Sequence, residues 1–103
     1  MAFSYMFNNA KSFNQPLDGW DVSNADMFSD MFNGATAFNQ PLPTWRMTKA
    51  LDTTSMFAAS TWNHPVNHFG FTRLVRTKAM FLQNSAFNQP MDQWNMSTVK
   101  YTD

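Results

Sequence analysis

Apolar and polar positions along this chain recur with a period of about 25 residues. A Met-Phe pair recurs at positions 6, 31, 56 and 80, with spacings of 25, 25 and 24 residues. The motif Phe-Asn-Gln-Pro begins at positions 13, 38 and 87, and its third copy reads Trp-Asn-His-Pro. One residue is missing between Phe57 and Trp62, after which the register recovers. The fixed period indicates a tandem-repeat fold, and the deletion indicates a surface loop at that point.

Each copy also holds a stretch that matches the L-x-x-L-x-L strand template of leucine-rich repeats. The last two apolar positions of the stretch alternate with polar ones, which is the period of a half-buried strand. Phe28, Met31, Phe32 and Ala35 then have helix-like spacing. The pattern predicts a leucine-rich-repeat-like β-solenoid of about four 24–25-residue coils, each with one short strand and a short helix or 3₁₀ turn. The strand stretches are Leu17–Val22, Leu42–Met47, Val66–Phe71 and Met91–Met96.

Stacking of the copies would place like residues above one another, because one 25-residue coil cannot bury its apolar face alone. Three aromatic columns are expected: Phe7, Phe32, Phe57 and Phe81; Phe13, Phe38, Trp62 and Phe87; and Trp20, Trp45, Phe69 and Trp94. An amide ladder that bonds to turn backbone and to itself is expected at Asn14, Asn39, Asn63 and Asn88.

Residues 1–103 are interpreted as one array with approximate units 6–30, 31–55, 56–79 and 80–103. The first residues fall within the repeat pattern, so we expect the chain to be a segment of a longer array.

Composition and charge restrict the function classes. The formal net charge is zero, which favours neither a nucleic-acid nor an anionic-membrane partner. The halves differ, however: residues 1–45 carry one lysine against four aspartates (−3), and residues 46–103 carry six cations against three aspartates (+3). Cysteine is absent, which excludes disulfides and thiolate metal sites. No signal peptide is visible, and no apolar run approaches the ~20 residues of a membrane span.

Candidate chemistry is weak. His64 and His68 lie four residues apart, but Pro65 separates them, and zinc normally needs three or four ligands. Asp18 and Asp21 could form a carboxylate pair, yet the next copy has Pro and Arg at these positions. We therefore expect no enzyme, metal site or cofactor. The basic cluster Arg73, Arg76 and Lys78 is expected to be a solvated face, with an acidic partner as the alternative.

The outward positions of the predicted strands are the candidate binding surface. Two of their columns vary from copy to copy, as a recognition surface would, and the third carries only hydroxyls. That hydroxyl column could cap the following turn, or could bind a glycan or ordered water. The candidate binding residues are Asp21, Ser23, Arg46, Thr48, His68, Thr72, Asn95 and Ser97.

The run from Phe13 to Asn24, followed by Asp30-Met31-Phe32, resembles the 25-residue repeat of BspA-type leucine-rich-repeat surface proteins of mycoplasmas and other bacteria. The resemblance covers essentially the whole chain. The third copy departs most, with His64 for Gln, Phe69 for Trp and a basic Thr72–Lys78 segment, and Ala25 stands where Val is usual. The resemblance implies a stacked fold displayed outside the cell in adhesion, and no catalytic residue.

The leading hypothesis is therefore a non-catalytic extracellular or cell-surface interaction module that binds a protein or glycan partner through its strand face. The alternative is a structural protein whose ends stack head to tail into filaments, since uncovered ends expose apolar columns and strand edges.

Overall fold

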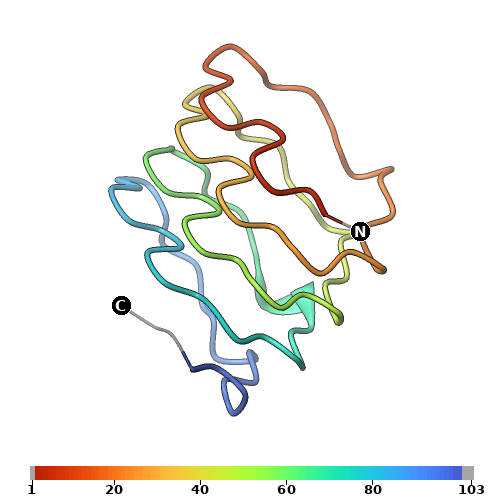
Figure 1. Ribbon diagram of the computed structural model, residues 1–103. Helices are drawn as coiled ribbons and strands as arrows, with labels where there is room; N and C mark the ends of the chain where they lie inside the picture. The colour runs from red at the N-terminus through yellow and green to blue at the C-terminus, as the bar shows by residue number, and fades with distance from the viewer. Residues whose placement is uncertain (1, 101–103) are drawn as a thin grey trace.

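Tight turns form the backbone of every copy in the computed structural model, which describes residues 2–100. The one helix within that range is the 3₁₀ helix η1, Asn67–Phe69. Parallel pairing there is limited to three isolated bridges, which join residue 2 to 27, 27 to 52, and 52 to 76. Figure 1 shows successive copies lying side by side in chain order, with the first and last copies at opposite ends of the molecule.

The predicted leucine-rich-repeat-like β-solenoid is wrong. The described residues form no sheet, and the molecule is a compact globule with extents of 35 × 28 × 22 Å. The predicted strands fail because their three-residue apolar spacing closes turns instead: the amides of Trp20, Trp45, Phe69 and Trp94 each donate to the carbonyl three residues earlier. A backbone that bends at this interval cannot extend into a ladder. The leucine-rich-repeat description of this chain fails with it.

Of the two alternatives predicted after each strand, a short helix or a 3₁₀ turn, the structure shows turns and no helix in residues 28–35. In residues 28–35, the amides of Met31, Asn33 and Ala35 donate three residues back, as in turns. Asp30 and Gly34 have φ of 57° and 79°, in the left-handed region, which interrupts a right-handed helix. The 3₁₀ helix η1 lies instead within the stretch predicted as the third strand.

The amides left out of these turns bond to the next copy. In residues 28–34, every second amide donates to a carbonyl 24 residues ahead, and the amide of Phe32 lies 2.9 Å from the oxygen of Met56. The same series runs from residues 3–9 to residues 27–33, and from residues 53–59 to residues 76–82. Turn bonds and inter-copy bonds thus alternate along the chain, which satisfies backbone groups that the core would otherwise leave unpaired.

Residues 3–9, 28–34, 53–59 and 77–83 are here called the ladder segments. Each holds two left-handed residues that lie four positions apart. They are Tyr5, Asn9, Asp30, Gly34, Ser55, Ala59, Ala79 and Gln83. Glycine adopts this conformation without steric penalty and Asn and Asp tolerate it, whereas each other residue carries roughly 1–2 kcal/mol of unfavourable energy. At Gly34 the space is occupied as well, since an added Cβ would collide with the side chain of Asn9.

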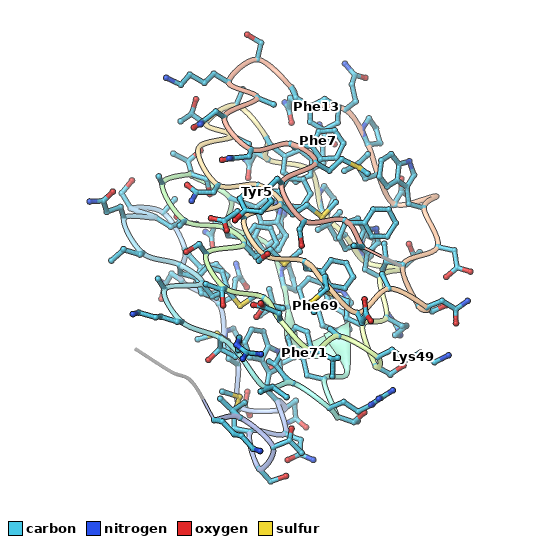
Figure 2. All side chains as sticks on the ribbon, in the orientation of Figure 1. Tyr5, Phe7, Phe13, Lys49, Phe69 and Phe71 are labelled. Carbon is cyan, nitrogen blue, oxygen red and sulfur yellow. The ribbon has the colours of Figure 1, made fainter. Side chains whose placement is uncertain are left out.

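Stacked aromatic rings fill the core between the copies. The Phe7 and Phe32 centroids lie 5.6 Å apart, those of Phe32 and Phe57 5.4 Å, and those of Phe57 and Phe81 5.7 Å, all nearly parallel. A second ring packs beside each of these within the same copy, as Phe13 does against Phe7 (Figure 2). Offset-stacked rings contribute beyond the area that they bury. The interior is continuous, with Trp45 and Trp62 fully buried.

We expect Ala59→Gly to stabilise the fold by about 0.5–1 kcal/mol, because glycine removes the backbone strain at φ 50°. The larger entropy that glycine gives the unfolded chain offsets part of this gain. The control is Ala58→Gly, at a buried neighbour without positive φ, which should destabilise by about 1 kcal/mol. Urea unfolding measures both. Equal losses in the two variants would contradict the left-handed assignment at Ala59.

Candidate interaction surface

Residues 18–23, 44–48, 68–72 and 93–97, here called the turn face, run along one side of the copies. Hydrogen bonds join neighbouring segments: the Thr44 hydroxyl donates to the oxygen of Asp18, and the Thr72 hydroxyl donates to that of Thr48 at 3.0 Å. The amide of Met47 donates to the oxygen of Phe69 at 2.6 Å. The turn face is therefore built from turns rather than from the predicted strands.

A shallow depression of about 310 Å³ lies on the first two segments of the turn face. Among its lining residues are Trp20, Asp21, Ser23, Thr44 and Arg46. The indole of Trp20 is 38% exposed. The depression thus brings acidic, basic and hydroxyl-bearing residues of two copies together.

Local bonds fix the charged groups of this depression. The Asp21 carboxylate accepts the Ser23 hydroxyl at 2.6 Å and the Ser23 amide at 3.0 Å. The bond from the Ser23 hydroxyl, followed by that from its amide, lowers the pKa of Asp21 below its ordinary value, because both bonds favour the charged form. Arg46 donates to the oxygens of Pro43 and Trp45, each at 3.1 Å, which holds its guanidinium close to its own turn.

The other predicted binding residues lie outside this depression. Thr48 and Thr72 are exposed on the next part of the turn face, and Asn95 and Ser97 are exposed in the last copy. His68 is half-buried, and its Nε2 lies 2.7 Å from the oxygen of Leu42. The structure therefore brings Asp21, Ser23 and Arg46 together, and distributes the other five along the remaining copies.

Sequence reasoning missed Trp20 as a surface residue, because it assigned this side chain to a core column. Its counterparts Trp45 and Phe69 are fully buried. Trp20 contacts Phe3 and Phe7 with ring centroids 5.9 and 5.8 Å away, yet more than a third of it faces solvent. Its place in the first copy was the available signal, since the described residues place no preceding copy over it.

The asparagines of the predicted amide ladder do not all make the same hydrogen bonds. Asn14 Oδ1 accepts the amide of Asn39 and the side chain of Gln40, each at 3.0 Å, and Asn63 Oδ1 accepts the corresponding pair from Asn88 and Gln89. Within residues 2–100 the side chain of Asn39 makes no such bond. His64 replaces the glutamine there, and its Nε2 meets the oxygen of Asn39 at 2.8 Å.

The described part of the chain gathers no group of three histidine, cysteine or acidic residues that could hold a metal ion. Both histidine rings bond to carbonyls of the preceding copy, as given above for His68 and His64. Arg73, Arg76 and Lys78 are all exposed. Within residues 2–100 there is no helix with the length and apolarity needed to cross a bilayer.

These features define a tandem-repeat protein held together by bonds between its copies. The chain belongs to the family described as Mycoplasma protein of unknown function, DUF285, whose model matches residues 1–69 and 58–103. This is the family of BspA-like mycoplasma surface repeat proteins, so the expected resemblance is confirmed at the level of the family. No curated protein and no solved structure matches the chain.

We expect Asn63→Ala to destabilise the fold by about 1–2 kcal/mol, because two donors of the next copy lose their acceptor. Asn39→Ala is the matched control in the same column and should change the free energy of unfolding by less than about 0.5 kcal/mol. Urea unfolding of both variants measures the difference, and equal changes would contradict the uneven bonding.

We expect Ser23→Ala to raise the pKa of Asp21 toward its ordinary value, because the hydroxyl bond to the carboxylate is lost. The internal control is Asp92, whose pKa is lowered mainly by the side chain of Asn67 and should not move. The lowered pKa means that Asp21 favours the folded state above its unfolded pKa and loses this contribution as pH falls through the folded one. Carboxyl NMR titration measures both groups, and an unchanged Asp21 would disprove the assignment.

Proposed function

We propose that this chain is a non-catalytic interaction module that binds a protein or glycan partner through the depression on its turn face. The observation that carries the proposal is the grouping of Trp20, whose side chain is partly exposed, with Asp21, Ser23, Thr44 and Arg46 in the lining of one depression. Tryptophan and arginine are the side chains that most often dominate binding energy at such surfaces. The charged groups would orient a polar partner, while the indole would supply apolar contact area.

Three features favour binding over catalysis. The depression contains no histidine among its lining residues. Its one hydroxyl–carboxylate pair joins Ser23 to Asp21, whose pKa is lowered, so this carboxylate is a weak base for activating a nucleophile. The guanidinium of Arg46 donates to two carbonyls of its own turn, which fixes its place on the surface.

The family resemblance supports a surface location for this module, where its partner would be outside the cell. Asp21 and Arg46 lie on the side of the copies, where both are exposed. Copies two to four continue the turn face with different outward residues, which would give each copy its own contact.

The test is binding of the labelled chain to a printed glycan array and to a panel of immobilised matrix proteins. Arg46→Ala should lower affinity for the probe that is bound by about tenfold or more, as expected for an arginine at the centre of an interface. Lys49→Ala is the charge-matched control, since Lys49 is exposed in the same copy, outside the depression (Figure 2). Equal loss in both variants, or no binding to either panel, would refute the proposal.

A further inference from the structure

One peptide bond of the second copy combines a reactive sequence with a protected position. Asn33-Gly34 is the one asparagine–glycine pair of the chain. Such pairs deamidate more readily than other asparagine pairs, because glycine has no side chain to hinder attack of its nitrogen on the asparagine side chain. The pair is therefore a candidate site for spontaneous covalent modification.

Hydrogen bonds to both neighbouring copies hold this peptide group. Its carbonyl, on Asn33, accepts the amide of Asn9 from the first copy at 2.7 Å. Its amide, on Gly34, donates to the oxygen of Ala58 from the third copy at 3.0 Å. Both bonds belong to the series that joins the copies, so the peptide group is fixed for as long as the copies stay paired.

The folded environment also opposes the reaction itself. The Gly34 nitrogen must lose its proton before it attacks, and this proton is bonded to Ala58 in a residue that is buried from water. The leaving group is held as well, because Asn33 Nδ2 donates to Asp30 Oδ1 at 2.9 Å. Deamidation therefore requires that these bonds break first.

The fold requires the glycine of this pair but not the asparagine. Gly34 has φ of 79°, and an added Cβ would collide with the side chain of Asn9. At the position of Asn33, by contrast, the next two copies have Ala58 and Leu82. The reactive nitrogen is thus retained for structural reasons, whereas alanine can replace the asparagine in a test.

We propose that Asn33 is a latent modification site, which deamidates through the Gly34 nitrogen only when the bonds to the neighbouring copies open. The Gly34 nitrogen bonds to Cγ of Asn33 and gives its proton to water, while Nδ2 takes up a proton and leaves as ammonia. Water then opens the resulting succinimide at one of its two carbonyls, which leaves an aspartyl or an isoaspartyl residue.

Either product opposes re-formation of the pairing. A carboxylate at position 33 removes the donor to Asp30 and brings two like charges together. An isoaspartyl residue also lengthens the main chain by one methylene, which moves the Gly34 amide away from the oxygen of Ala58. Separation of the copies is reversible before this reaction and irreversible after it. The inference goes beyond the proposed binding function, because Asn33 lies outside the turn face.

Peptide mapping by mass spectrometry tests the protection. The chain is incubated at mildly alkaline pH in native buffer and in urea, with a synthetic peptide of residues 28–36 as the unprotected standard. Asn33 should deamidate in urea at the rate of the peptide. In native buffer it should react at least about tenfold more slowly, because the reaction follows the population of the open form. Equal rates in native buffer and urea, or no reaction in urea, would overturn the proposal.

A core variant tests whether separation of the copies sets the rate. Phe57→Ala removes a ring that stacks on both Phe32 and Phe81. In native buffer it should raise the deamidation rate of Asn33 several-fold, and as far as the urea rate if the variant does not fold. Gln15→Ala, at an exposed position, should keep the rate of the parent. A parent-like rate in Phe57→Ala would contradict the proposed mechanism.

Recovery from urea tests the consequence. After long incubation and removal of urea, chains deamidated at Asn33 are separated by charge from unmodified chains. The deamidated fraction should unfold at a lower urea concentration than the unmodified one. Asn33→Ala cannot form the succinimide at this position and should regain its starting midpoint after the same treatment. An unchanged midpoint in the deamidated fraction would overturn the proposal.

Discussion

The alternation of turn bonds with inter-copy bonds is the constraint on which the rest of the structure depends. Every second amide of a ladder segment donates to the next copy, so the facing segment of that copy must offer carbonyls at alternate residues. The repeat length can therefore change only outside this segment. The missing residue of the third copy obeys this rule, because the series continues through Ala59 and the deletion falls between Ala59 and Trp62. Core rings stay aligned on both sides of it, as Phe57 shows by stacking on Phe32 and Phe81.

The sequence revealed the period and the residues that recur, but not the backbone that carries them. Apolar spacing of three residues suits a strand template, a helix and a turn alike, and here the turns form. The left-handed residues make the backbone turn instead of continuing as a strand or helix, and the sequence identifies only some of them. Gly34, Asn9 and Asp30 are residue types that tolerate positive φ, whereas Tyr5 and Ala59 are not. The donors of the inter-copy bonds are main-chain amides, which no side-chain pattern identifies.

The sequence also predicted only part of the candidate site. Alternation placed Asp21, Ser23 and Arg46 outward, and all three line the depression. The same reasoning assigned Trp20 to the interior, because it treated all copies as equivalent. A side chain that is covered in a middle copy is uncovered in an end copy, so burial depends on position in the stack as well as on position in the repeat.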